Sequence, residues 1–300
     1  MADNSLPRTD TQFAVGFVGL GDQGLPMATA IAASGYDLHV WARRQASLDA
    51  LDDTSRIEHP SLRALARAVD IVILCVRTDD DVLVLLTEEL LPATRPGTII
   101  VNVGTGTPGN ATRAAELCAR ASVSFIDAPV SGGRIGAEAR TLTTLVGGST
   151  EVFDAVKPLF DSYSAHVLHC GGHGAGQLVK LFNNTLLMMN QAGIADIINL
   201  ATQAGIDPIA LAEALKLGSG ASEALVRTPT NSPVSLSDTA AHLSQVELLD
   251  MDLFDQAMTE AGIDAAEATA RGIAGASALA RVVALLNPEP ATTVQGGRDE

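Results

Sequence analysis

The chain has 300 residues, of which 47% are hydrophobic and 3% aromatic, so a folded globular protein with a core of mainly Ala, Leu, Val and Ile is expected. Two domains are expected at this length. The formal net charge of −16 at pH 7 argues against nucleic acid or an anionic membrane as a partner.

The cysteines and the N-terminal segment favour a cytoplasmic protein. Cys75, Cys118 and Cys170 are far apart in sequence, which gives neither a metal-ligand spacing nor a disulfide framework. The first twelve residues are polar and include acids, unlike a signal peptide. No uninterrupted apolar run reaches the roughly 18 residues of a membrane span. We therefore expect no bound metal and no membrane partner.

A glycine-rich segment follows the first predicted strand. Residues 13–18 are a short apolar run, typical of a buried parallel strand, and a helical stretch and a second strand follow the glycines. The segment has GxGxxG spacing and consists of Gly19, Leu20, Gly21, Asp22, Gln23 and Gly24. Between a strand and a helix, this spacing predicts a dinucleotide site, because the glycines let a pyrophosphate approach the helix N-terminus.

The end of the second predicted strand indicates which dinucleotide binds. Proteins that bind NAD usually have Asp or Glu there for the ribose hydroxyls. Here Arg43 and Arg44 follow Ala42, with no carboxylate between the strand and Gln45. Two arginines in an acidic chain favour a 2′-phosphate and therefore NADP, with NAD as the alternative. A solvated surface pair is the other interpretation of these arginines.

Strands and helices continue to alternate to about residue 172, which predicts an open parallel sheet with its ligands at the carboxyl ends of the strands. Val76, Thr105 and the segment Ser131–Gly133 then border one crevice. Ser131, Gly132 and Gly133 can direct backbone N–H groups at a carboxylate. A flexible turn has the same composition.

A long apolar segment follows. Residues 175–204 contain no proline and are apolar nearly all round, which predicts a helix of roughly 45 Å that is buried on every side. It carries Lys180, one of three lysines, and Asn184 lies one turn later on the same face. Burial would lower the pKa of Lys180 and make it a proton donor and acceptor near neutral pH. Alternatively, its ammonium reaches solvent near the helix start.

Three motifs together resemble one family, the 3-hydroxyisobutyrate dehydrogenase group of the β-hydroxyacid dehydrogenases, which are relatives of 6-phosphogluconate dehydrogenase. They lie at residues 17–28, 127–143 and 174–184, within a resemblance that spans residues 13–262. The resemblance implies that Lys180 is the catalytic acid/base and that Thr105 lies beside the nicotinamide ribose. It also implies a substrate site made by Ser131, Gly132, Gly133 and Asn184.

The family's fold is α/β, with a doubly wound N-terminal Rossmann domain and an all-α C-terminal domain like that of 6-phosphogluconate dehydrogenase. The resemblance places the NADP-binding domain at 13–172 and the helical domain at 173–290, with an interdomain helix at 173–204. From their composition, residues 1–12 and 291–300 are expected to be flexible tails. It implies an NADP-dependent dehydrogenase or reductase that acts on a small β-hydroxy acid or its semialdehyde, as a homodimer or homotetramer.

Two departures from the family pattern leave the substrate open. Met251 stands where the family often has a lysine, and Arg140 stands where it has a glycine. A site that lacks one cation suits a 3-hydroxy amino acid, although Arg134 or Arg140 could restore the charge. An imine reductase on the same scaffold is a further alternative. A non-catalytic dinucleotide-binding protein is the alternative from another class.

Overall fold

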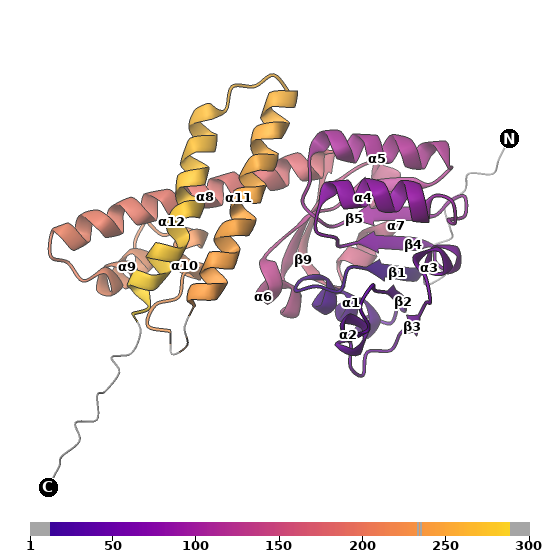
Figure 1. Cartoon of the computed structure of the whole chain (residues 1–300), viewed down its shortest axis with the longest axis horizontal. Coiled ribbons are helices and arrows are strands. Elements are labelled where there is room, and N and C mark those ends of the chain that lie inside the picture. The colour runs from indigo at the N-terminus through magenta and orange to yellow at the C-terminus, as the bar shows by residue number, and fades with distance from the viewer. Residues whose placement is uncertain (1–12, 233, 235, 289–300) are drawn as a thin grey trace, which may run out of the picture. The chain divides into compact units, whose positions relative to one another are not determined.

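The computed structural model describes residues 13–232, 234 and 236–288. The tails predicted to be flexible, 1–12 and 291–300, lie outside the described residues. The chain forms two compact units, divided between Leu181 and Phe182 (Figure 1).

The first unit contains one sheet. Its strand order over the described residues is β3-β2-β1-β4-β5-β6-β8-β7, with β9 paired to β8. The strands β1 to β6 are parallel and have the 3-2-1-4-5-6 order of a Rossmann fold, whereas β8 is antiparallel to β6 and β7. The strands are β1 (Ala14–Val18), β2 (Asp37–Trp41), β3 (Ile57–Glu58), β4 (Ile71–Leu74), β5 (Ile99–Asn102), β6 (Ser124–Asp127), β7 (Val130–Ser131), β8 (Leu142–Gly147) and β9 (Ser164–Gly171).

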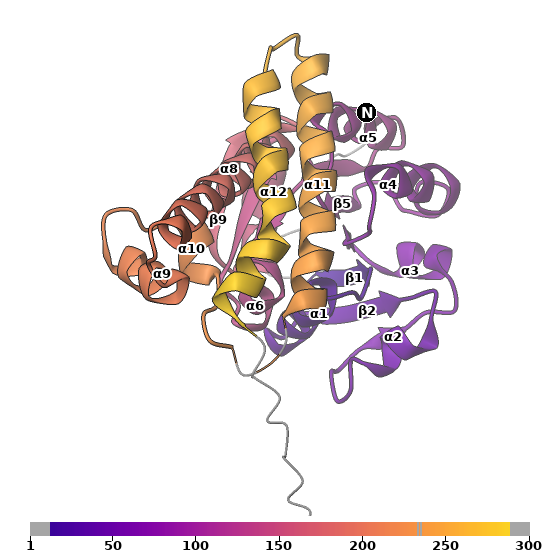
Figure 2. The same cartoon turned by 60° about the vertical axis from the view of Figure 1, so that its left-hand side comes forward.

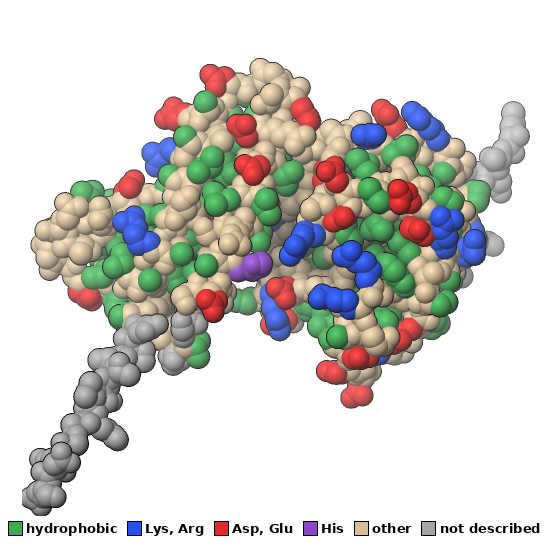
Figure 3. All heavy atoms as spheres, in the orientation of Figure 1, with side chains coloured by type: hydrophobic (Ala, Val, Ile, Leu, Met, Phe, Trp, Pro, Cys, Tyr) green, Lys and Arg blue, Asp and Glu red, His purple; other side chains and the backbone are tan. Residues whose placement is uncertain are grey.

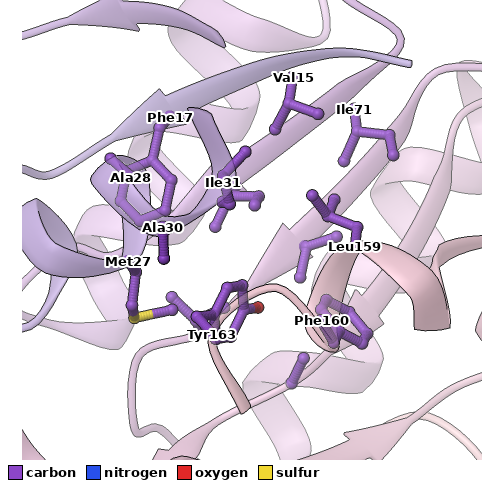
Figure 4. Packing of buried hydrophobic residues seen from close by; sticks show 14 of the residues in the cluster. Val15, Phe17, Met27, Ala28, Ala30, Ile31, Ile71, Leu159, Phe160 and Tyr163 are labelled. Carbon is purple, nitrogen blue, oxygen red and sulfur yellow. The ribbon is translucent and has the colours of Figure 1, made fainter. Parts of the chain in front are cut away.

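Helices cover both faces of this sheet, as the doubly wound prediction requires. One core cluster joins β1 to α1 and α7, and Figure 4 shows Phe17, Ile31 and Phe160 among its members. A second cluster lies under α3, α4 and α5. The helices are α1 (Gly24–Ala33), α2 (Gln45–Asp49), α3 (Leu62–Ala68), α4 (Asp79–Leu85) with the π-helical segment η1 (Leu86–Leu90), α5 (Pro108–Arg120), α6 (Gly133–Glu138) and α7 (Thr150–Phe160).

The long helix α8 (Ala175–Gln203) is present, but the prediction that it is buried on every side is wrong. Leu186 is 59% exposed and Leu200 is 60% exposed. In the second unit, Ala195 and Ile198 pack with residues of α9, α10 and α12. An apolar sequence is buried only where neighbouring elements cover it, and in this chain they cover one stripe of the helix.

The second unit is helical. It contains α9 (Pro208–Leu217), α10 (Glu223–Arg227), α11 (Ser237–Glu260) and α12 (Ala266–Leu286), and α11 and α12 lie side by side (Figure 2). Of the described helices, α12 alone is long and apolar enough to cross a membrane, with a mean hydropathy of 1.3. A helix of a protein core meets the same criteria, and Leu279 and Val283 of α12 pack against Ala240 of α11.

Candidate active site

The glycine-rich turn joins β1 to α1. Gly19 has a φ of +101°, and a Cβ at this residue would lie 2.0 Å from the carbonyl oxygen of Cys75. Only glycine fits there. At Gly21 a Cβ would meet nothing within 4 Å, so the backbone is open to the close approach of a ligand. Because Gly24 begins α1, the helix N-terminus adds N–H donors and a favourable dipole. The turn, completed by Leu20, Asp22 and Gln23, therefore fits the phosphates of a dinucleotide.

A cavity of about 860 Å³ opens beside this turn. Leu20, Gly21 and Asp22 line it together with one side of α1, the connection between α2 and β3, and the segment around α6. Arg44 is in the cavity wall, whereas Arg43, its exposed neighbour, is not among the lining residues. Of the two arginines predicted to bind a 2′-phosphate, one therefore lines the same cavity as the glycine turn.

The other two predicted cofactor residues follow adjacent strands. β4 and β5 pair in parallel, with Leu74 opposite Asn102. Val76 and Thr105 lie just beyond these strands, and a Cβ at Gly104 would lie 3.2 Å from the carbonyl oxygen of Val76. Both segments therefore meet at the carboxyl edge of the sheet, where ligands bind in this class of fold.

A buried carboxylate fixes the start of α8. Asp127, at the end of β6, accepts hydrogen bonds from the N–H of Gly174 (2.8 Å) and the N–H of Gln177 (2.9 Å). Burial raises the pKa of Asp127, and these two hydrogen bonds oppose the rise. The close approach of the first turn of α8 to β8 requires glycine at position 176, because a Cβ there would lie 2.4 Å from the carbonyl oxygen of Leu145. Asp127 thereby satisfies N–H groups that a helix start leaves unpaired.

The side chain of Gln177 extends this connection to the loop after β5. Its Nε2 donates to the carbonyl oxygen of Gly104 (2.8 Å), and its Oε1 accepts from the N–H of Gly106 (2.8 Å). Gln177 is fully buried. Lys180 lies three residues later on α8 and is 8% exposed, which confirms that it is buried.

The turn predicted to bind a carboxylate has an unusual backbone. β7 ends at Ser131, Gly132 has a φ of +132°, and Gly133 has a φ of +64° and begins α6. These φ values favour glycine. A Cβ at Gly133 would meet nothing within 4 Å, so a ligand could approach the backbone there.

Within the second unit, Asn184 is hydrogen-bonded to α11. Its Nδ2 donates to Oδ2 of Asp250 (2.7 Å), and its Oδ1 accepts from Nδ2 of Asn183 (3.0 Å). Two turns further along α8, Nε2 of Gln191 donates to Oε1 of Glu247 (2.9 Å). Burial raises the pKa of Glu247 to about 7, and the charge of Asp250 adds to the rise. Asn184 is thus bound to a carboxylate, one turn after Lys180 on the same helix.

Comparisons with known proteins agree with the fold of both units. Residues 14–172 match the model described as the NAD binding domain of 6-phosphogluconate dehydrogenase. Residues 174–284 match that described as the NAD-binding region of NADP-dependent 3-hydroxyisobutyrate dehydrogenase. An NAD-dependent L-serine dehydrogenase of Pseudomonas aeruginosa is 33% identical over 81% of this chain and 84% of its own length. The chain belongs to the 3-hydroxyisobutyrate dehydrogenase family.

A second relative supports the assignment to the 3-hydroxyisobutyrate dehydrogenase family, and a solved structure supports the fold. A 3-hydroxyisobutyrate dehydrogenase of Pseudomonas aeruginosa is 32% identical over 70% of this chain and 72% of its own length. The solved structure of Mycobacterium tuberculosis 3-hydroxyisobutyrate dehydrogenase with L-serine has a TM-score of 0.79 at 24% identity, over 92% of this chain and 97% of that one. These relatives are hydroxyacid dehydrogenases that use NAD(P), so the chain is an oxidoreductase with an NAD(P)-binding Rossmann domain.

Met251, which stands at the family's lysine position, packs against α12. It is fully buried, and a Cβ at Gly272 of α12 would lie 2.4 Å from its Sδ. The neighbouring Asp250 contacts Asn184 instead. A carboxylate therefore lies beside Asn184 on α11, whereas the family pattern has a cation in this part of the helix.

Two residues of this site were not identified from the sequence. Asp127 and Gln177 lie within the motifs that carry the family resemblance, but a role for them depends on the contact between β6, α8 and the loop after β5. For Asp127, the sequence signal was an acidic residue at the carboxyl end of a predicted buried strand. Among the described residues, no group of three or more His, Cys, Asp or Glu side chains is arranged to hold a metal ion.

Proposed function

We propose that the chain is an NADP-dependent oxidoreductase for a small β-hydroxy acid or the corresponding semialdehyde, with Lys180 as the general acid/base. The observation that carries the proposal is the position of Lys180. It is a buried lysine on α8, one turn after Gln177. The side chain of Gln177 is hydrogen-bonded to Gly104 and Gly106, the two neighbours of Thr105. This supports a proton-transfer group held close to the predicted nicotinamide end of the dinucleotide site.

The roles of the side chains follow from their chemistry. When bound, the nicotinamide supplies the hydride donor or acceptor. In the direction of oxidation, neutral Lys180 takes the proton of the substrate hydroxyl at its Nζ atom, and in reduction its ammonium returns the proton. From the family resemblance, we assign the backbone of Ser131, Gly132 and Gly133 to the substrate carboxylate and the amide of Asn184 to the orientation of the substrate.

The preference for NADP rests on the two arginines after β2. Arg43 and Arg44 are exposed, Arg44 lines the cavity beside the glycine turn, and no carboxylate is at the position that contacts ribose hydroxyls in NAD-binding proteins. Guanidinium groups suit a phosphate because they donate two parallel hydrogen bonds. Since one relative is named as NAD-dependent, cofactor choice has to be measured for this chain.

A 3-hydroxy amino acid is the second candidate substrate, and one contact favours it. Asp250 is hydrogen-bonded to Asn184, so a negative charge lies beside the residue proposed to orient the substrate. A carboxylate there would attract the ammonium of an amino acid and repel a second carboxylate. The named L-serine dehydrogenase among the relatives supports the same substrate class.

We also propose a homodimer or homotetramer in the cytoplasm. Large apolar side chains of α8 and α11 are exposed in the single chain, including Leu186, Leu200 and Leu249. Exposed apolar side chains of this kind support contact with another copy. The three cysteines are free thiols, which is consistent with a reducing compartment.

The proposal is tested by a turnover screen at the absorbance of the reduced nicotinamide. A 3-hydroxy acid and L-serine are offered with NADP⁺ and with NAD⁺, and a cyclic imine is offered with NADPH. We expect turnover of one of the first two, and a kcat for Lys180→Ala at least about 10²-fold lower with dinucleotide binding retained.

Lys157→Ala is the matched control, because Lys157 is a partly exposed lysine paired with Asp161 in the same unit. It should keep wild-type turnover. Near-wild-type turnover by Lys180→Ala would remove the role proposed for that lysine. Dinucleotide binding without turnover of any compound would support the non-catalytic alternative, and turnover of the cyclic imine alone would support an imine reductase.

A further inference from the structure

The cavity beside the glycine turn contains three arginines from separate segments. Arg44 precedes α2, Arg134 is in the first turn of α6, and Arg140 lies just after α6. α6 contacts α1, and this contact brings the two later arginines to the cavity that begins at Gly21. Only Arg44 was predicted from the sequence to meet the dinucleotide. Arg134 and Arg140 were considered there only as charges for the substrate.

These arginines differ in their partners. Arg134 forms an ion pair with Glu138 (2.7 Å), and the charge of Asp22 in the glycine turn also raises the pKa of its guanidinium. Arg134 therefore lies within electrostatic reach of the turn. Arg44 and Arg140 are exposed, and the ion pairs found among the described residues include neither of them. Two guanidinium groups of this cavity thus remain available for an anion.

Arg140 has a backbone conformation that disfavours an arginine. Its φ is +57°, in the left-handed region where a Cβ is close to the following carbonyl oxygen. Glycine would take this conformation without strain. Non-glycine residues in this region are concentrated at functional sites, where the strain is offset by a contact that the residue makes. Arg140 combines this backbone with a position in the cavity wall.

Carboxylates also line the cavity. Glu138 is already paired with Arg134, whereas Asp52 and Asp53 belong to the wall formed by the α2–β3 connection. Figure 3 likewise shows basic (blue) and acidic (red) side chains interspersed on the visible face of this unit. A diffuse positive field therefore does not fill the cavity. An anion has to be bound by direct hydrogen bonds from the guanidinium groups, whose planar geometry matches a phosphate.

We propose that Arg134 and Arg140 bind a phosphate group of the dinucleotide, so that α6 forms a second wall of the phosphate site opposite the glycine turn. The inference rests on the proposed function in one respect, namely that the ligand is a nicotinamide dinucleotide. The phosphate can be the 2′-phosphate or the pyrophosphate. The cavity contains both Arg44 and Gly21, which are the residues expected next to these two groups.

Arg140→Gly tests the proposal without straining the backbone, because glycine accepts the φ of this position. Dissociation constants of NADP⁺, NAD⁺ and 2′,5′-ADP are measured by calorimetry for the whole chain. We expect NADP⁺ to bind roughly 10-fold more weakly, and Arg134→Gln to act in the same direction. If the variants lose affinity for NADP⁺ and 2′,5′-ADP but not for NAD⁺, the arginines bind the 2′-phosphate. If they lose affinity equally for NADP⁺ and NAD⁺, the arginines bind the pyrophosphate. Unchanged affinities for all three ligands would overturn the proposal.

Two control variants separate this contact from general effects. Ser122→Gly makes the same backbone change at another residue with a φ of +57°, and Arg113→Gln removes an exposed positive charge from α5. Both should bind NADP⁺ as the wild type does, and an equal loss in either control would also overturn the proposal. A wild-type chain that prefers NAD⁺ would contradict the proposed cofactor. The effect of the variants on NAD⁺ affinity would still test the contact with the pyrophosphate. Failure of the proposed cofactor and failure of the proposed phosphate contact can therefore be distinguished.

Discussion

The side-chain amide of Gln177 is hydrogen-bonded on both sides of Thr105, to the carbonyl oxygen of Gly104 and to the N–H of Gly106. One buried side chain therefore fixes the loop after β5 relative to the first turn of α8. Because Lys180 is three residues later on the same helix, its backbone is fixed relative to Thr105 as well. Gln177 is a positioning residue for the proposed proton transfer, since it acts through Lys180 and Thr105.

Gln177→Leu should lower kcat by roughly 10–100-fold, because it leaves a buried N–H and a buried carbonyl group without partners and frees the loop. Gln177→Glu keeps the acceptor for the N–H of Gly106 but turns a buried carboxylate oxygen toward the carbonyl oxygen of Gly104, so its kcat should fall at least as much. Steady-state kcat and KM are measured beside the urea midpoint. A lower midpoint with an unchanged kcat would mean that Gln177 has only a structural role. Gln203→Leu, at the exposed end of the same helix, is the control.

The double variant Arg43→Ala with Arg44→Ala should bind NADP⁺ roughly 10²-fold more weakly and leave NAD⁺ within about 3-fold, because only NADP⁺ carries the 2′-phosphate. Fluorescence titration of the reduced cofactors gives both dissociation constants. If the double variant loses affinity equally for both cofactors, these arginines do not bind the 2′-phosphate. Arg63→Ala, an exposed arginine paired with Glu89, controls for the loss of charge.

Asp250→Asn should shift the substrate preference of the enzyme. The variant keeps the size of the side chain and its bond to Asn184 but removes the negative charge beside it. For a 3-hydroxy amino acid we expect kcat/KM to fall roughly 10-fold relative to a 3-hydroxy acid, because attraction of the ammonium is lost. The ratio of the two kcat/KM values is the measurement. An unchanged ratio would contradict the amino acid candidate, and Asp252→Asn, the exposed neighbour on α11, should leave it unchanged.

The parts of the fold that follow from local chemistry could be predicted. The GxGxxG turn, the alternating strands and the caps are of this kind. Thr107 caps α5 through a bond from the N–H of Asn110 (3.1 Å), and Asp207 caps α9 in the same way. The short elements α2, β3, β7 and α6 were not predicted, because two to six residues are too few to show a hydrophobic period.

The parts of the site that depend on tertiary contact could not be predicted. Lys180 was identified because a lone lysine in an apolar helix is unusual, and Arg44 because a basic residue in an acidic chain is unusual. Gln177 has no such signal, since its role arises only where α8 meets the loop after β5. The exposure of Leu186 and Leu200 was missed for the same reason, because the sequence does not show which faces of a helix its neighbours cover.

Glu247 makes the stability of the second unit dependent on pH. Its pKa is raised to about 7 by burial and by the charge of Asp250, whereas the bond from Gln191 opposes the rise. In the unfolded chain the pKa of this glutamate is near its ordinary value of 4.5. The folded state therefore binds the proton more tightly, and the stabilisation is fully present below pH 4.5 and is lost as the pH rises through 7. Since the group is partly exposed, we expect a loss of about 2 kcal/mol.

Glu247→Gln tests this dependence. Glutamine is neutral at every pH and can still accept the bond from Gln191, so the variant should be more stable than the wild type at pH 8 and close to it at pH 5. Urea midpoints at pH 5, 6, 7 and 8 give the comparison, and Glu260→Gln, at the exposed end of α11, should follow the wild type. Parallel curves for Glu247→Gln and the wild type would show that Glu247 is not the titrating group. The difference should grow from pH 5 to about pH 7 and then level off, because only between about pH 4.5 and 7 does the folded wild type hold a proton that the unfolded chain has released.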